Sequence, residues 1–191
     1  NCCTLEPIDS ITIKIRDSLR MDLISKDTAL CAGDQVTLHA TGDPSFTYSW
    51  LPSAGIMNPQ DTLTFANPTQ TTTYTVIASY KSCPDVSRSF TATVEPIPIV
   101  DILTKDLNIC IGDPLQINAT VEPASFQNYT YTWSPPTGLN DPTIKEPLFF
   151  VTTPGDFHFT LTASTPLGCK GSDSLHIIAR PGMELTNVTA D

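Results

Sequence analysis

The sequence is poor in charge. Only 16% of its 191 residues are Asp, Glu, Lys or Arg, against about 25% in typical soluble domains. Basic residues number 10 and acidic residues 20, which gives a formal net charge of -10. A surface of this kind repels the phosphate backbone of nucleic acids and the headgroups of anionic membranes, so we expect neither as a partner.

Long apolar runs and sorting signals are also missing. No apolar run reaches the roughly 18 residues of a membrane span, so we expect no membrane insertion. The first residues, "NCCTLEP", have neither the basic start nor the apolar core of a signal peptide. We therefore expect a mature chain or one cut from a longer polypeptide.

Motifs of catalytic and phosphate-binding sites are missing as well. The sequence contains no GxSxG and no HExxH, and its glycines number only 9. The histidines, His39, His158 and His176, lie in segments with strand periodicity and share no local spacing with an acid or a nucleophile. We expect them to face solvent on strands, and we expect no enzymatic activity.

What the chain does contain is a repeat. The stretch "LCAGDQVTLHA" matches "ICIGDPLQINA", and "YSWLPSAGI" matches "YTWSPPTGL". The offset between the copies is 79 from Cys31 to Cys110 and 86 from Cys83 to Cys169. The second copy therefore has extra residues, some of them in "VEPASFQN", a loop where added length costs little.

The flanks of the two copies extend the repeat. "CCTLEPIDSITIKI" reads as the end of an earlier copy, and "MELTNVTAD" reads as the first strand of a later one. Domain edges fall at the Pro-rich "EPIPIV" and at "RPG". We expect the C-terminal end of a preceding repeat at 1–20, complete repeats at 21–97 and 98–181, and the start of a following repeat or a linker at 182–191.

Apolar and polar residues alternate within each copy, which is the period of half-buried strands. Several short strands in about 80 residues predict a small β-sandwich, so the predicted fold class is all-β. The alternation places Trp50 and Trp133 on the apolar face, as core tryptophans rather than platforms for sugar rings. It also predicts that Leu63 and Phe65 face inward.

The cysteines predict disulfides. None has the paired CxxC spacing of a zinc site. Their even number in an acidic, Thr-rich β protein indicates disulfides formed in an oxidising compartment, and therefore an exported protein. The 6 cysteines are Cys2, Cys3, Cys31, Cys83, Cys110 and Cys169.

The pairing of these cysteines has two alternatives. Because a domain of about 80 residues has a small core, one disulfide in each copy would stabilise it, which gives Cys31–Cys83 and Cys110–Cys169 as the first choice. However, the first turn and the last hairpin of such a sandwich lie at opposite ends. The bond then joins neighbouring repeats instead, for instance Cys31 to Cys169. The partners of Cys2 and Cys3 stay open among the 15 connectivities that six cysteines allow.

Aspartates in the turns are candidate calcium ligands. Calcium takes six to eight oxygen ligands from clustered carboxylates and carbonyls. These aspartates are dispersed and form no D-x-D-x-D run, so turn hydrogen bonding is favoured over calcium, and we expect no cofactor and no metal. The residues concerned are Asp34, Asp43, Asp61, Asp113, Asp141 and Asp156.

The motifs together resemble a known group of repeats. Cys-x-Gly-Asp, Tyr-x-Trp-x-Pro, Thr-Thr-Thr-Tyr-Thr-Val and a late Cys, between Met21 and Arg180, are similar to the PKD-like and Ig-like repeats of Bacteroidetes cell-surface proteins. Such repeats fill gliding-motility adhesins of the SprB type, which the type IX secretion system exports. The resemblance implies tandem Ig-like or PKD-like sandwiches in an extracellular, cell-surface protein. The Trp-x-Phe-Gly-Asp-Gly signature of PKD domains is absent.

The tripeptide Asp-(Ser/Thr)-hydrophobic resembles the O-glycosylation sequon of exported Bacteroidetes proteins. The alternative is that Asp-Ser or Asp-Thr simply begins a strand after a turn. The resemblance implies glycans on Ser10, Ser18, Thr28, Thr62 and Ser174.

Three functions fit these observations. The favoured one is a non-enzymatic structural and adhesive segment of a long repetitive surface filament, in which neighbouring repeats of the same chain are partners. The second is a module that binds a surface polysaccharide or a cell-surface protein. The third is a spacer in a secreted hydrolase.

Overall fold

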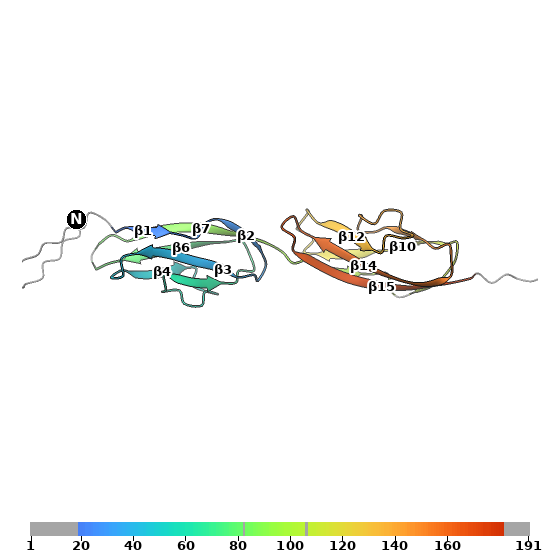
Figure 1. Cartoon of the computed structure of the whole chain (residues 1–191), viewed down its shortest axis with the longest axis horizontal. Helices are drawn as coiled ribbons and strands as arrows, with labels where there is room; N and C mark the ends of the chain where they lie inside the picture. The colour runs from blue at the N-terminus through green and yellow to red at the C-terminus, as the bar shows by residue number, and fades with distance from the viewer. Residues whose placement is uncertain (1–18, 82, 106, 182–191) are drawn as a thin grey trace, which may run out of the picture. The chain divides into compact units, whose positions relative to one another are not determined.

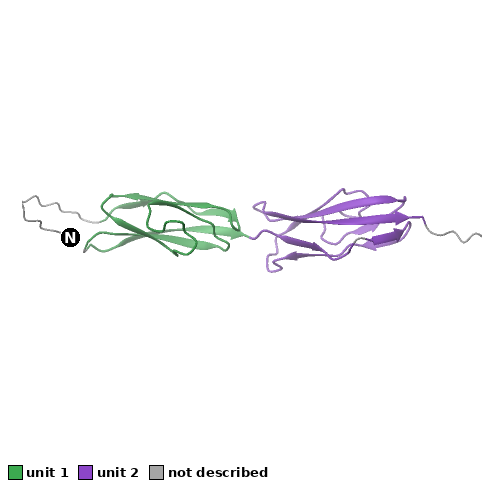
Figure 2. Ribbon diagram, turned by 90° about the horizontal axis from the view of Figure 1, so that it is seen from below, with its two compact units in different colours: residues 1–95 green, residues 96–191 purple. Residues whose placement is uncertain are grey.

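The computed structural model describes residues 19–81, 83–105 and 107–181. In these ranges it consists of strands and turns, and it contains no helix long and apolar enough to cross a membrane. The all-β prediction is confirmed (Figure 1). The chain divides between Glu95 and Pro96 into unit 1 and unit 2 (Figure 2), two residues before the boundary expected from the sequence.

Unit 1 is a sandwich of two sheets, with the strand orders β1-β3-β5 and β2-β7-β6-β4. Strand β2 pairs with β7 in parallel, and the other neighbours are antiparallel. The strands are β1 (Met21–Leu23), β2 (Thr28–Cys31), β3 (Val36–Gly42), β4 (Thr47–Leu51), β5 (Leu63–Ala66), β6 (Thr72–Ser79) and β7 (Val86–Glu95).

Unit 2 repeats this arrangement. Its larger sheet has the order β12-β14-β15-β9, and β9 is again parallel to the last strand. The facing layer consists of the pairs β11-β8 and β10-β13. The strands are β8 (Ile99–Ile102), β9 (Leu107–Cys110), β10 (Pro114–Gln116), β11 (Ala119–Glu122), β12 (Thr130–Ser134), β13 (Leu148–Phe150), β14 (Gly155–Ser164) and β15 (Lys170–Arg180).

A hydroxyl side chain marks the point where the chain leaves one sheet for the other. The Ser25 hydroxyl donates to the Thr37 carbonyl at 2.9 Å and accepts the His39 N–H at 2.8 Å. In unit 2 the Thr104 hydroxyl accepts the Asn118 N–H at 2.9 Å. These side chains replace ladder bonds that the backbone gives up when β1 or β8 ends.

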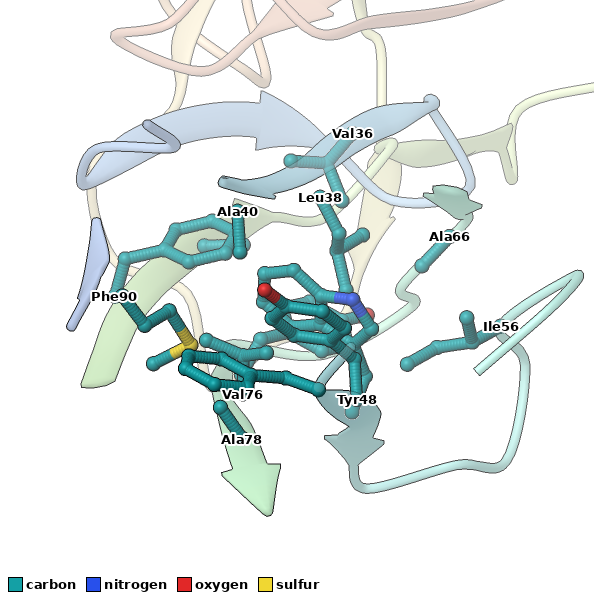
Figure 3. Packing of buried hydrophobic residues seen from close by; sticks show 14 of the residues in the cluster. Val36, Leu38, Ala40, Tyr48, Ile56, Ala66, Val76, Ala78 and Phe90 are labelled. Carbon is teal, nitrogen blue, oxygen red and sulfur yellow. The ribbon is translucent and has the colours of Figure 1, made fainter. Parts of the chain in front are cut away.

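The core of unit 1 forms where alternate side chains of the two sheets meet (Figure 3). Leu38, Val76 and Ala92 come from three different strands and are fully buried. Trp50 packs edge-on against Phe90, with ring centroids 6.4 Å apart and an interplanar angle of 87°. Burial of each large side chain contributes about 1.5–3 kcal/mol.

The core of unit 2 is organised around Phe149 in β13. Its ring lies 4.9 Å from that of Phe159 and 5.1 Å from that of Phe157, both in edge-to-face geometry. Ile117 and Leu161 pack in the same cluster and are fully buried. Each unit therefore has a separate hydrophobic core.

The prediction that Leu63 and Phe65 face inward is wrong. Leu63 is 50% exposed, whereas Thr64 and Ala66 are each 1% exposed. The pairing of β5 with β3 explains the difference, because it sets Thr64 opposite the buried Leu38. Residues directly opposite each other on paired strands share one face of the sheet, so the longer strand decides which face of a four-residue strand is buried.

Candidate functional site

The two tryptophans occupy equivalent core positions. Trp50 is 0% exposed and Trp133 is 1% exposed. Each indole Nε1–H donates to a carbonyl in the loop that follows its strand, Asp61 at 2.9 Å and Ile144 at 3.0 Å. Neither ring face is accessible for stacking on a sugar.

The tyrosines are likewise structural. Burial raises the pKa of Tyr48, Tyr74 and Tyr131 above the ordinary 10.0, and the nearby Asp43 carboxylate is a second, smaller cause for the pKa of Tyr48. The Tyr48 hydroxyl donates to the Asp43 carbonyl at 3.3 Å. These phenols stay neutral at physiological pH, which suits core packing and not proton transfer.

The cysteines occur in two positions in each unit. Cys31 and Cys110 end β2 and β9, and we call them the turn cysteines; Cys83 and Cys169 precede β7 and β15, and we call them the hairpin cysteines. Cys31, Cys83 and Cys169 are disulfide-bonded. Among the described cysteines, Cys110 has a free and exposed thiol. Cys2 and Cys3 lie outside the described residues.

The predicted Cys110–Cys169 pairing is wrong, because the Cys110 thiol is free. Sheet geometry gives the reason. Cys110 lies opposite Arg180, the last residue of β15, and Cys169 directly precedes Lys170, the first. The length of β15 separates the two cysteines by about 30 Å, whereas a disulfide needs Cα atoms within about 7 Å.

The same geometry excludes the predicted Cys31–Cys83 pairing. Cys31 lies opposite Glu95 at the end of β7, and Cys83 lies before Val86 at its start. The strand between them is again about 30 Å long. The bonds of Cys31 and Cys83 therefore go to other cysteines.

The aspartates considered for calcium do not come together. In the described part of the chain, no group of three or more His, Cys, Asp or Glu side chains could hold a metal ion. The Asp43 carboxylate accepts the N–H and the hydroxyl of Ser45, at 2.9 and 2.6 Å. The Asp141 carboxylate accepts the same two groups of Thr143, at 2.8 and 2.6 Å. Both carboxylates close turns, as Asx motifs do.

The histidines lie on strands. His158 of β14 and His176 of β15 are cross-strand partners, and their rings stack at 4.2 Å with an interplanar angle of 2°. His39 lies in β3 opposite Leu63. The stack is a cross-strand pair, and in the described residues it belongs to no group of three His, Cys, Asp or Glu side chains that could hold a metal ion.

Three of the five residues implied as glycosylation sites are described, and all three are exposed. Thr28 begins β2, Thr62 precedes β5, and Ser174 lies on the outer face of β15, where its hydroxyl is 3.2 Å from that of Thr160. Ser10 and Ser18 lie outside the described residues. The Asp173 beside Ser174 also has a structural contact, since its carboxylate accepts the Ile102 N–H at 2.8 Å.

A shallow hollow of about 410 Å³ lies on unit 2, beside the turn that follows β13. Its lining includes Gly138, Leu139, Phe149, Phe150 and Phe157. Phe150 is 50% exposed at this place, which makes it the most exposed aromatic ring of the core-forming strands. The hollow is therefore apolar and open to solvent.

Unit 1 has a hollow of about 380 Å³ at the equivalent place. Gly55 matches Gly138, and the bridge between Ile56 and Ala66 matches the bridge between Leu139 and Phe149. Here, however, Asn67 replaces Phe150, and its side chain donates to the Gly33 carbonyl at 3.0 Å. Sequence reasoning missed both hollows, although the repeated Pro-x-x-Gly before them marks the loop that borders each one.

Comparison with known proteins identifies the fold. Residues 22–96 match the family model described as "Ig-like domain CHU_C associated", so unit 1 is an Ig-like domain. The match spans less than half of the chain. No curated protein matches the sequence.

The chain is similar to solved structures, among them an array of immunoglobulin domains. Sidekick-1 immunoglobulin domains 1–4 align with a TM-score of 0.51 at 12% identity, over 87% of this chain and 50% of that chain. An I-band fragment of titin gives 0.50 at 13% identity, over 83% and 65%. Hemolin, an insect immune protein, gives 0.50 at 13% identity, over 92% and 53%. The chain thus spans about half to two thirds of these proteins, and the likeness shows the Ig-like fold.

Proposed function

We propose that this chain is a non-enzymatic structural and adhesive segment of a long, repetitive cell-surface protein. The observation that carries the proposal is the duplication: two sandwiches share strand order, a buried tryptophan and its loop hydrogen bond, and a parallel strand that ends in a cysteine. Repeated scaffolds of this kind supply length and surface rather than a single reaction centre.

The sequence motifs support a more specific role. The resemblance of both copies to repeats of Bacteroidetes surface proteins favours export by type IX secretion, exposure at the cell surface and a part in gliding motility. The match of unit 1 to a family of Ig-like domains agrees with a role as a repeated extracellular domain. Its partners in this role are neighbouring repeats and a surface polysaccharide or a cell-surface protein.

Glycosylation is part of the same proposal. Thr28, Thr62 and Ser174 are exposed hydroxyl residues that follow an aspartate, and their side chains are open to a modifying enzyme. Thr28→Val, Thr62→Val and Ser174→Ala would each remove one glycan mass from the native protein. Peptides that carry the unmodified mass at all three positions would contradict this part.

The test of the main proposal is the intact mass of the native polypeptide. We expect a species many times heavier than the 20.7 kDa of this chain, and heavier still than its peptide content predicts because of glycans. Denaturing electrophoresis with an antibody against unit 2 and mass spectrometry make the measurement. A native species near 20.7 kDa would refute the filament and leave a discrete two-domain protein.

The hollow on unit 2 supports a second candidate, a binding module. Phe150 presents an exposed aromatic ring beside an apolar hollow, as ligand-binding surfaces do. Phe150→Ala would then weaken binding to an array of surface oligosaccharides by about tenfold, since exposed aromatic anchors dominate such sites. Leu103→Ala is the matched control, because Leu103 is also 50% exposed but does not line the hollow. Equal binding by both variants would exclude this site.

A further inference from the structure

Each sandwich presents one cysteine at each end of its last strand. The turn cysteine lies opposite the final residue of that strand, and the hairpin cysteine lies just before its first residue. A bond between the two is excluded by about 30 Å of strand. The repeat nevertheless retains both cysteines in both copies, and the three bonded ones, Cys31, Cys83 and Cys169, have partners outside their own pair.

The two turn cysteines have the same backbone setting. Ala32 N–H donates to Glu95 O at 2.9 Å, and Ile111 N–H donates to Arg180 O at 3.0 Å. The following glycines donate to the next loop in the same way, at 2.9 and 3.1 Å. Yet Cys31 is disulfide-bonded, whereas Cys110 has a free and exposed thiol. The bonded state of Cys31 shows that this setting forms a disulfide, and Cys110 has the setting without the bond.

The direction of the chain identifies the partner. The turn cysteine lies at the end where the chain leaves a sandwich, beside Glu95 in unit 1 and Arg180 in unit 2. The hairpin cysteine lies at the end where the chain enters: Cys169 lies two residues before Gly171, where an added Cβ would clash with the backbone of Pro98 near the start of unit 2. We propose that Cys110 forms a disulfide with the hairpin cysteine of a following copy of this repeat.

The bond forms by thiol–disulfide exchange with a small-molecule disulfide such as oxidised glutathione. The Cys110 thiolate attacks one sulfur of that disulfide, forms a mixed disulfide and releases one glutathione thiol. The hairpin thiolate then attacks the Cys110 sulfur and releases the second. In total, two protein thiols are oxidised and one small disulfide is reduced.

This inference rests on the proposed function in one respect, the presence of a further copy of the repeat. The experiment therefore supplies that copy. A second copy of residues 96–181 is joined directly after Arg180, so that Pro96 of the added copy takes the place of Pro181 and the spacing between repeats is kept. Thr152→Ser in the added copy changes the mass of the tryptic peptide that contains its hairpin cysteine. A negative result refutes the bond and has no bearing on the adhesive role.

The readout is non-reducing peptide mapping after refolding with oxidised and reduced glutathione. We expect Cys110 of the original copy to be linked to the mass-shifted hairpin peptide, and the final turn cysteine to be alkylated. Cys169→Ser in the added copy should leave Cys110 fully alkylated. Alkylation of Cys110 in the extended chain, or its linkage to any other cysteine, would overturn the proposal.

A positional control tests whether the disulfide requires a thiol at position 110 itself, or whether any nearby thiol would form it. Asn108→Cys with Cys110→Ser moves the thiol two residues along the exposed side of β9, which is about 7 Å. Disulfide geometry does not tolerate that shift, so we expect cross-linking at least about tenfold slower. Equal rates would also refute the proposal. In a Trp50→Phe background, the tryptophan emission reports that the two copies of unit 2 are folded in every variant, because a buried indole emits at shorter wavelength.

Discussion

Unit 1 and unit 2 fill one frame with different side chains. In unit 1 the core includes the small Ala66 of β5 and the large Phe90 of β7. In unit 2 the equivalent of Ala66 is Phe149, which makes the same bridge to the preceding loop. The equivalent of Phe90 is Leu175, because Leu175 pairs with Phe159 as Phe90 pairs with Tyr74.

The difference shows that the frame of the core is kept while the identities and sizes of its residues are not. The β5 position is small in unit 1 and its equivalent in β13 is large, whereas the position in the last strand is larger in unit 1. Interiors are packed at near-crystalline density, so each unit fills its core with its own set of side chains. The Trp at the centre of both cores, Trp50 or Trp133, stays fixed because its indole N–H is tied to a loop carbonyl.

The largest expected effect comes from truncating Phe149 in unit 2. Phe149→Ala leaves a cavity beside Phe157 and Phe159, whose rings pack against that of Phe149. We expect unit 2 to lose about 3–5 kcal/mol of unfolding free energy. Chemical denaturation of a Trp50→Phe background, followed by the emission of Trp133, measures unit 2 alone.

Adding Leu175→Phe to Phe149→Ala recreates the combination found in unit 1. We expect recovery of about half of the loss, since volume returns but local packing is not re-optimised. Leu175→Phe alone should destabilise by about 1–3 kcal/mol through overpacking. Additive effects of the two changes would mean that positions 149 and 175 do not share core volume.

A glycine pair gives the next largest effect. Gly55 and Gly138 have nearly equal positive φ angles, 78° and 83°. A Cβ at Gly55 meets nothing within 4 Å, whereas one at Gly138 would lie 2.7 Å from Cε2 of Phe149, whose ring is held in the core. We expect Gly55→Ala to cost about 1–2 kcal/mol from backbone strain alone, and Gly138→Ala to cost about 1–3 kcal/mol more from the clash.

The quantity to measure is the difference between the two variants in lost unfolding free energy, because the backbone strain is common to both and cancels. Thermal unfolding gives that difference when each variant is made in a background that keeps only the tryptophan of its own unit, Trp133→Phe for Gly55→Ala and Trp50→Phe for Gly138→Ala. Combining Gly138→Ala with Phe149→Leu should remove most of this difference in unfolding free energy, because the clashing ring is then absent. A difference that persists with Leu at 149 would locate the clash elsewhere.

Trp50→Phe and Trp133→Phe should have smaller effects that match each other. Each substitution leaves a loop carbonyl, of Asp61 or Ile144, without its indole donor. We expect a loss of about 1–3 kcal/mol in the unit concerned. Denaturation followed by far-ultraviolet circular dichroism measures both, and losses that differ more than twofold would mean that the two hydrogen bonds are not equivalent.

Much of the fold follows from the sequence because period-two alternation is a local signal. The alternation in "VTLHA" and "YSW" identifies β3 and β4, and parity places Trp50 inward. Leu63 was wrongly assigned because β5 has only four residues and its face is set by pairing with β3. Register is a non-local property, and an apolar residue in a short edge strand does not reveal it.

The cysteines show the limit of local reasoning most clearly. Sequence spacing places Cys110 and Cys169 in one repeat, but the parallel pairing of β9 with β15 sends them to opposite ends. The hollows were also beyond reach, since the one on unit 2 depends on Phe150 pointing outward while its neighbour Phe149 points in. Both features depend on which strands become neighbours. Strand pairing is determined by packing across the whole core, so it is not visible in any local stretch of the sequence.

The smallest expected effect concerns Asp141, whose equivalent in unit 1 is Asn58. Hydrogen bonds from the hydroxyl and the N–H of Thr143 lower the pKa of the Asp141 carboxyl below its ordinary 3.8. Because the folded form favours the carboxylate, this stabilisation is complete above about pH 4 and is lost as the pH falls through the folded pKa. Asp141→Asn, the residue of unit 1, should leave unit 2 unchanged near neutral pH and make its unfolding less sensitive to acid below about pH 3.8. Thr143→Val keeps the N–H and removes the hydroxyl, so in a carboxyl NMR titration the pKa of Asp141 should move part of the way back towards 3.8. An unchanged pKa would mean that the N–H alone holds the turn, and the two units would then differ at this position in charge but not in mechanism.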